Sequence, residues 1–148
     1  MTQLKVMRKI LIVTIISSIV LIVGCSNKNL VTEPDASKEP FGEKYGFTSF
    51  DITIDTKELK EALIANYNEK RDKTEAIYKN QAEDLYLNGN KAMKKLDTLF
   101  EELSLDPDMD AEDIIKKASE TFGIIDYKTL KIKVQFKGHD KKELMMTK

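Results

Sequence analysis

The sequence lacks most of the residue patterns from which enzyme active sites are built. Tryptophan is absent, there is one histidine and one cysteine, and the six glycines are scattered along the chain. No Gly-x-Gly-x-x-Gly or Walker pattern is present to bind phosphate, and no Gly-x-Ser-x-Gly pattern is present to expose a nucleophile. Without tryptophan, the many carboxylates have little aromatic surface with which to form a sugar-cleaving site. We therefore expect a protein that is not an enzyme and that needs no cofactor.

Positive charge is not concentrated in one block, although lysine is abundant. The chain has 24 basic and 25 acidic residues, and the lysines are mixed with Glu and Asp as on an ordinary solvated surface. There is no basic segment with interleaved aromatic residues, so we do not expect nucleic-acid binding.

No acidic residue precedes Cys25, and this N-terminal segment has the features of an export signal. Lys5, Arg8 and Lys9 precede a largely apolar run over residues 10–23, as in the positive and apolar regions of a signal peptide. As a helix the run is about 21 Å long, short of the roughly 30 Å hydrocarbon layer, so an uncleaved membrane anchor is the weaker alternative. The order Leu21-Ile22-Val23-Gly24-Cys25 fits the lipobox of bacterial lipoproteins.

Lipidation of Cys25 would place the protein on the extracytoplasmic face of a cell membrane. We expect residues 1–24 to be a removed lipoprotein signal peptide, and Cys25 to carry a diacylglycerol with palmitate-type chains, each buried CH₂ contributing about 0.8 kcal/mol. Because Cys25 is the only cysteine, no thiol remains for a disulfide or a nucleophile. Residues 1–24 hold three of the 24 basic and none of the 25 acidic residues, so the mature net charge is 21 minus 25, or −4.

The segment after Cys25 has the composition of a linker. Residues 25–45 are mostly polar, include Pro34 and Pro40, and show no sustained apolar period, so we expect a lipidated cysteine followed by a flexible tether. Such a tether reaches roughly 25 Å and would lift the domain clear of the headgroups. Residues 46–148, about 100 in number, are enough for one compact domain.

The first part of this domain has strand patterns. Phe50, Ile52 and Ile54 alternate with polar residues, which predicts a strand with one buried face. After a turn at residues 56–60, the segments 63–67 and 75–78 are shorter candidate strands. Residues 59–87 contain no glycine or proline, and part of them also fits helical spacing, so a helix there is left open.

Two amphipathic helices and a final strand follow. The first helix begins just after Asn88-Gly89 and has one apolar face, and the second spans residues 111–122, with Asp110 as its N-cap and Gly123 at its end. Alternation over residues 130–136 predicts a strand with lysine on its exposed face, and residues 143–146 can form a return strand. The first helix's apolar residues are Ala92, Leu96, Leu99, Phe100 and Leu103, and those of the second are Ala111, Ile114, Ile115, Ala118 and Phe122.

These elements predict an α+β domain in which an antiparallel sheet is covered on one face by the pair of amphipathic helices. Because lysines alternate with the apolar residues of the final strand, we expect lysine to line the open face of the sheet.

Three residue groups have a chemical interpretation that must be weighed. The acidic run over residues 106–113 resembles a calcium loop, but Ala111 and Lys117 stand where an EF-hand needs glycine and glutamate, so we expect no metal site. His139 beside Asp140 is expected to be an exposed turn residue rather than a catalytic base, because no nucleophile accompanies it. Six aromatic residues are expected to belong mainly to the core and not to an exposed patch that binds a partner. They are Tyr45, Phe47, Tyr67, Tyr78, Tyr86 and Tyr127.

The order of motifs over about residues 46–136 resembles the YusW-like family of small bacillar lipoproteins from Gram-positive bacteria. The resemblance rests on the lipobox at Cys25, Tyr45-Gly46-Phe47, Phe50-Asp51-Ile52, Glu75-Ala76-Ile77, Gly89 before Ala92 and Leu96, Leu103-Ser104-Leu105 with Met109, Thr121-Phe122-Gly123-Ile124, and the strand from Leu130 to Phe136. Residues 137–140 depart from the simpler turn of that family. These motifs specify the fold better than the chemistry, and the family has no established activity to transfer.

Two function classes fit these features. The first is a tethered accessory module that binds a membrane or cell-wall protein through the open sheet face or an open strand edge. The second is a small-ligand binder with a pocket between helices and sheet. Because a domain of about 100 residues uses most of its apolar side chains to close one core, we expect the first class.

Overall fold

The computed structural model describes residues 27–32 and 42–148. The predicted signal peptide, Cys25 and residues 33–41 of the predicted tether lie outside the described residues, so the prediction of lipidation is not tested by the structure.

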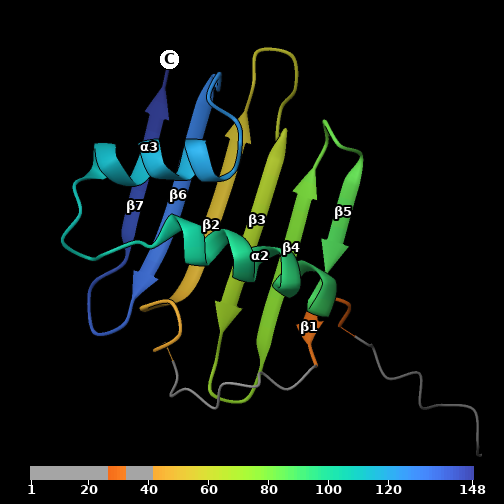
Figure 1. The fold of residues 1–148 in the computed structure, drawn as a ribbon, viewed down its shortest axis with the longest axis vertical. Helices are drawn as coiled ribbons and strands as arrows, with labels where there is room; N and C mark the ends of the chain where they lie inside the picture. The colour runs from red at the N-terminus through yellow and green to blue at the C-terminus, as the bar shows by residue number, and fades with distance from the viewer. Residues whose placement is uncertain (1–26, 33–41) are drawn as a thin grey trace, which may run out of the picture.

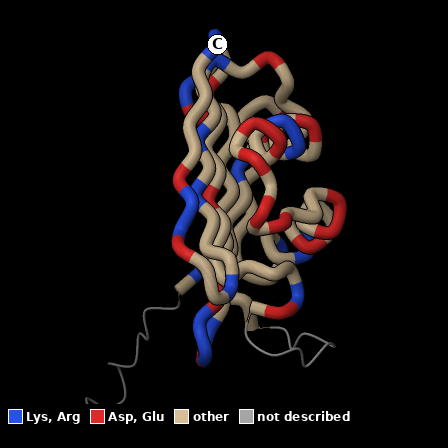
Figure 2. Tube along the Cα trace, turned by 90° about the vertical axis from the view of Figure 1, so that its left-hand side faces the viewer, with Lys and Arg blue, Asp and Glu red and all other residues tan. Residues whose placement is uncertain are grey.

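In the described residues, the fold is a seven-stranded antiparallel sheet with two helices on one face, which confirms the predicted α+β architecture (Figure 1). Neighbouring strands follow the order β1-β4-β3-β2-β6-β7, and β5 also pairs with β4. In chain order the elements are β1 Leu30–Val31, β2 Phe47–Asp55, β3 Leu63–Glu69, β4 Thr74–Asn80, β5 Leu85–Asn88, α2 Gly89–Leu103, α3 Ala111–Thr121, β6 Thr129–Phe136 and β7 Lys142–Thr147. Figure 2 shows the sheet nearly edge-on, with both helices on the same side.

The two strands with the clearest alternation lie side by side in the middle of the sheet. Ile52 of β2 is directly opposite Ile132 of β6, and both side chains are at most 1% exposed. The apolar positions of both strands therefore share the face that the helices cover. The return strand predicted over residues 143–146 is confirmed as β7, which pairs with β6.

The choice left open for residues 59–87 is decided in favour of strands. β3 pairs with β2 on one side and with β4 on the other, so its backbone groups are bonded in ladders and not within a helix. Leu63, Ala65 and Tyr67 are buried beneath the helices, and the residues between them face the other way. β5 is a further strand that the sequence pattern did not predict.

An aromatic cluster joins α2 to the sheet. The ring of Phe100 is 3% exposed and lies 5.1 Å, between centroids, from the rings of both Tyr45 and Phe47. Phe50 and Tyr67 follow at 5.3 and 5.4 Å, and all four contacts are edge-to-face. This geometry is the favourable one for aromatic pairs and adds to the burial of apolar surface.

The second helix ends as predicted, but its start differs from the prediction. Gly123 follows the end of α3 and donates its N–H to Glu120 O at 3.0 Å. Asp110 occupies the N-cap position, yet its side chain makes no capping hydrogen bond, and Ala111 is exposed rather than part of the apolar stripe. The carbonyl oxygen of Asp110 still accepts the first helical bond, from Ile114 N.

Part of the predicted tether belongs to the folded domain, which corrects the expectation for residues 27–32. Leu30 and Val31 form β1 and pair with Glu75 and Thr74 of β4. The tether prediction failed here because a two-residue strand is too short to show a period. The position of this strand is set by hydrogen bonds to distant parts of the chain, such as the one that Ala76 N donates to Asn29 O at 2.8 Å.

Candidate functional site

The face of the sheet that the helices leave uncovered, which we call the open sheet face, is the candidate functional site (Figure 2). Its side chains come from alternate positions of β2 to β7 and are half-buried or exposed, whereas their neighbours in sequence are mostly buried. The strand register arranges them in rows that cross the sheet. Since adjacent strands are about 4.8 Å apart, a row over six strands spans about 24 Å.

The first row combines apolar ends with two lysines. Its members are Tyr86, Lys79, Ile64, Thr53, Lys131 and Met145. Tyr86 and Met145, at the two ends, are 60% and 67% exposed. Within the part of the chain that the structure describes, neither Lys79 nor Lys131 has an ion pair. The row carries two positive charges and no negative charge, and it exposes an apolar side chain at each end.

The second row is polar and has a carboxylate at its centre. Its members are Asn88, Ile77, Asn66, Asp51, Lys133 and Glu143. Asn66 Nδ2 donates a hydrogen bond to Asp51 Oδ1, and Lys133 Nζ lies 3.4 Å from Glu143 Oε1. Burial raises the pKa of Asp51 above its ordinary value, and the charges of Lys141 and Lys133 and the Asn66 hydrogen bond oppose this shift only in part. The carboxylate at the centre of this row is thus partly desolvated.

One end of the sheet offers an open strand edge. β7 pairs with β6, and no strand among the described residues pairs with its outer side. Lys142 ties β7 to the loop between the helices, because its Nζ donates to Pro107 O and Met109 O at 2.5 and 3.2 Å. An extended segment of a partner can add to such an edge.

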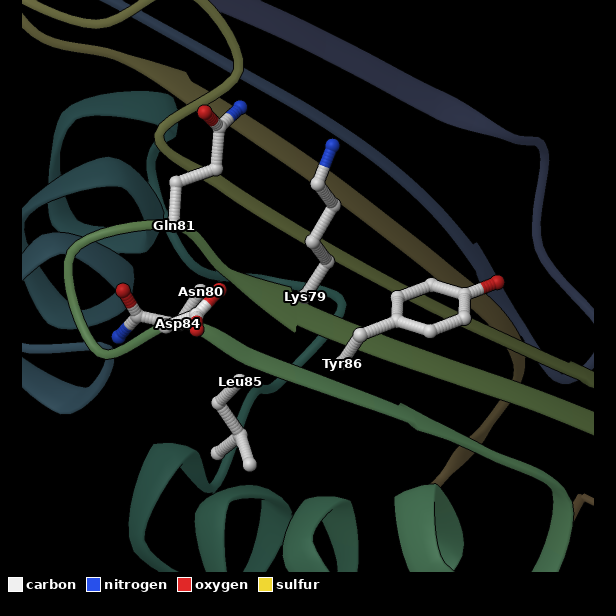
Figure 3. Close-up of a pocket in the computed structure, with 6 residues that line it drawn as sticks. All are labelled: Lys79, Asn80, Gln81, Asp84, Leu85 and Tyr86. Atoms are coloured by element: carbon white, nitrogen blue, oxygen red, sulfur yellow. The ribbon is translucent and has the colours of Figure 1, made fainter.

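A hollow of about 240 Å³ lies at the turn between β4 and β5 (Figure 3). Its lining residues are Lys79, Asn80, Gln81, Asp84, Leu85 and Tyr86. Figure 3 shows Leu85 pointing toward the helix and Lys79 pointing to the opposite side of the sheet. Small-molecule sites usually have about 300 to 1,000 Å³, so this hollow is small for a solute, and it does not lie beneath the helices.

The acidic run over residues 106–113 makes a turn and the start of α3. Asp106 Oδ1 accepts the N–H of Asp108 at 2.8 Å, so one carboxylate is used within the turn. In residues 27–32 and 42–148, no three side chains of His, Cys, Asp or Glu are grouped closely enough to hold a metal ion.

His139 is an exposed residue in the turn between β6 and β7, as predicted. Its backbone N–H donates to Phe136 O at 3.3 Å, and its carbonyl oxygen accepts from Gln135 Nε2 at 2.5 Å. Two serines have roles within the helices: Ser104 is the C-cap of α2, and Ser119 Oγ donates to Lys116 O at 2.9 Å.

The aromatic residues divide largely as predicted. Phe47, Tyr67, Tyr78 and Tyr127 are at most 5% exposed, and Tyr45 packs against the core. Tyr86 is the exception, since it stands on the open sheet face. Its partners in the first row, Met145 and Ile64, were also not identified as site residues. Alternation within the short strands was the available signal, but it does not say which face the helices cover.

No helix in the described part of the chain is long and apolar enough to cross a membrane.

Comparison with known proteins identifies a family for this chain. The model of the YusW-like protein family matches residues 48–138, which is more than half of the sequence and extends from β2 to the turn after β6. No curated protein and no solved structure matches the chain.

Proposed function

The chain belongs to the YusW-like protein family, and from this premise we propose that it is a non-enzymatic accessory lipoprotein at the extracytoplasmic face of the cell membrane. In this proposal Cys25 carries the lipid anchor, and the open sheet face binds a membrane or cell-wall protein. No cofactor and no nucleic acid take part.

The observation that carries the binding role is the exposure of Tyr86 and Met145 at the two ends of one row on an uncovered sheet face. Tyrosine and methionine are enriched in protein interfaces. The face measures about 24 Å across the strands and about 20 Å along them, so its flat area is roughly 500 Å². This is somewhat below the roughly 800 Å² that a partner contributes to a standard interface, which favours a transient contact.

The filled core supports the same choice over a solute-binding function. Phe47, Phe50, Leu96 and Leu103 fill the space between helices and sheet, and each is at most 1% exposed. The hollow at the β4–β5 turn is smaller than usual ligand sites. Binding of a small ligand beneath the helices would therefore require these side chains to move.

A site-specific crosslinking experiment tests the binding role. A photoreactive amino acid is placed at Tyr86 or at Met145 in the full-length protein in its own membranes, with Thr98 on the exposed side of α2 as the matched position. We expect one adduct of the same mass from Tyr86 and Met145 and none from Thr98. Adducts that are equally strong from Thr98, or an absence of adducts from both sheet positions, would contradict the proposal.

The anchor is tested separately by the substitution Cys25→Ala. We expect the precursor to remain unprocessed and unlipidated, so that the variant keeps residues 1–24 and lacks the two acyl chains. Mass spectrometry should show the added lipid and the loss of residues 1–24 in the wild-type chain, and neither change in the variant. A wild-type chain that keeps residues 1–24 and carries no lipid would argue for an uncleaved transmembrane anchor.

A further inference from the structure

Only two positions in the sequence separate Cys25 from Asn27, the first described residue of the folded domain, so a lipid on Cys25 would bring one end of the sheet near the membrane. Asn27, two residues after Cys25, is held in place because its Nδ2 donates to Glu75 Oε1 at 2.6 Å. Two residues of extended chain span at most about 7 Å. A lipid on Cys25 would therefore hold this part of the domain close to the headgroups, and not about 25 Å away as a fully flexible tether would allow.

The segment around β1 is fastened to the domain by several bonds. Besides the pairing of β1 with β4, Thr32 N donates to Asn90 Oδ1 at 2.6 Å and Asn90 Nδ2 donates to Thr32 Oγ1 at 2.8 Å. Asn29 O accepts the N–H of Ala76 at 2.8 Å. These bonds connect the segment to both β4 and the start of α2, so it moves with the domain.

The turn between β3 and β4 lies at this end of the sheet and is basic. Lys73 Nζ binds the same oxygen of Glu75 that Asn27 binds, at 3.3 Å, so the turn and the start of the described chain meet at one carboxylate. Residues 70–73 contain Lys70, Arg71 and Lys73 with one acidic residue, Asp72, and all four are exposed. Figure 1 shows this turn and β1 at the lower end of the sheet, where Figure 2 shows the projecting turn largely in blue.

The opposite end of the same strands has no such excess of positive charge. The loop at residues 56–61 contains two lysines and two glutamates, and the turn at residues 81–84 contains Glu83 and Asp84 without a basic residue. β3 has seven residues, so the two ends are roughly 20 Å apart. This distance exceeds the Debye length of about 10 Å at 0.1 M salt, so a membrane at one end would act on that end alone.

We propose that the basic turn at residues 70–73 docks on anionic phospholipid headgroups of the membrane that holds the Cys25 anchor. This inference rests on the lipid anchor of the proposed function. The basic turn of an acidic domain then faces the negative membrane, the strands rise away from the surface, and the open sheet face is presented sideways to proteins in or on the same membrane.

The test uses the full-length lipidated protein in vesicles and measures how close the turn at residues 70–73 lies to the lipid headgroups. Because the mature wild-type chain has its only cysteine blocked by lipid, Asp72→Cys introduces a single thiol for a fluorophore, and Glu58→Cys places the same label in the opposite loop with the same change of charge. The quencher is a nitroxide on a lipid headgroup. In vesicles with about one third phosphatidylglycerol we expect strong quenching at position 72 and little at position 58, and in pure phosphatidylcholine we expect less quenching at position 72.

Charge variants identify the turn as the docking element. Each basic residue near an anionic surface changes the docking equilibrium about fivefold, so Lys70→Ser with Arg71→Ser should weaken docking about 25-fold and reduce quenching at position 72 to the level seen in phosphatidylcholine. The matched control, Lys57→Ser with Lys60→Ser in the opposite loop, should leave it unchanged. Salt at 1 M, where the Debye length is about 3 Å, should release the turn while the protein stays on the vesicles.

The outcomes separate this inference from the anchor itself. The docking of the turn is wrong, and the anchor stands, if the protein floats with the vesicles but the labels at positions 72 and 58 are quenched equally. The same conclusion follows if quenching at position 72 does not depend on the anionic lipid, or if both pairs of charge substitutions have the same effect. If the wild-type protein reacts with the thiol label or does not float, the anchor fails, and the docking inference falls with it.

Discussion

Gly89, the first residue of α2, packs closely against the backbone of the β1 segment. Its replacement by alanine tests whether the β1 segment is part of the folded domain. Gly89 has a φ of +55°, and a Cβ atom there would lie 2.6 Å from Leu30 O and 2.9 Å from Lys28 O. Both neighbours are backbone atoms, so a side chain rotation cannot relieve the contact. We expect Gly89→Ala to push the β1 segment away from α2 and β4.

The loss of stability in Gly89→Ala is compared with the loss in a matched variant, Gly138→Ala. Gly138 has a φ of +74°, but a Cβ atom there has no neighbour within 4 Å, so Gly138→Ala carries only the cost of a left-handed alanine, about 1 to 2 kcal/mol. Gly89→Ala has the same cost and also loses hydrogen bonds of the β1 segment, each contributing about 1 kcal/mol net. After the freed segment regains conformational entropy, we expect Gly89→Ala to lower the free energy of unfolding by at least about 1 kcal/mol more than Gly138→Ala.

Urea denaturation measures the two costs, and hydrogen exchange locates the change. The N–H of Ala76 donates to Asn29 O, so its protection should be lost in Gly89→Ala and kept in Gly138→Ala. If the two variants lose equal stability and Ala76 stays protected in both, the β1 segment does not depend on Gly89, and the inference that an anchor on Cys25 holds this end of the domain near the membrane loses its support.

Two further predictions concern the core and the open sheet face. Phe100→Ala should lower the free energy of unfolding by about 3 to 5 kcal/mol in urea denaturation, because it removes the ring at the centre of the aromatic cluster. Tyr86→Ala should lower it by less than about 0.5 kcal/mol. Equal losses in the two variants would contradict the assigned core. Burial raises the pKa of Asp51, so the folded protein holds this proton more tightly than the unfolded chain, and the ionised group lowers stability as the pH rises through the folded pKa. Asp51→Asn should therefore stabilise the protein at pH 7, by less than about 1 kcal/mol because the half-exposed carboxylate is screened by water. The gain in stability should disappear below about pH 3.9, the ordinary pKa of an aspartate. Urea titrations from pH 3 to 7 that show a gain independent of pH would refute this.

Long segments with a clear period were predictable because burial on one face leaves a direct trace in the sequence. Ile52 and Ile132 mark the buried face of two strands, and the spacing of Ala92, Leu96 and Leu103 marks the buried face of a helix. The α+β architecture followed from these elements, because a sheet face and two helix stripes that are apolar must cover one another.

Segments with short or mixed patterns were not predictable in the same way. Residues 59–87 fit two periods, and the strand conformation is set by ladders to β2 and β4, which are contacts between distant parts of the chain. β5, with four residues, and β1, with two, are too short to show a period. For Asp110, the sequence predicted a helix start but not that its side chain would leave the cap unbonded.

The sequence by itself determined the family, the apolar faces of the long strands and helices, and the lipobox on which the anchor proposal rests. Only the tertiary structure decided which face of the sheet stays open, that Tyr86 and Met145 stand in one row on it, and that Asn27 and Lys73 meet at Glu75. The physical reason is that periodicity records how each segment is buried, whereas a surface assembled from several strands depends on their order and register, which arise when the whole sheet forms.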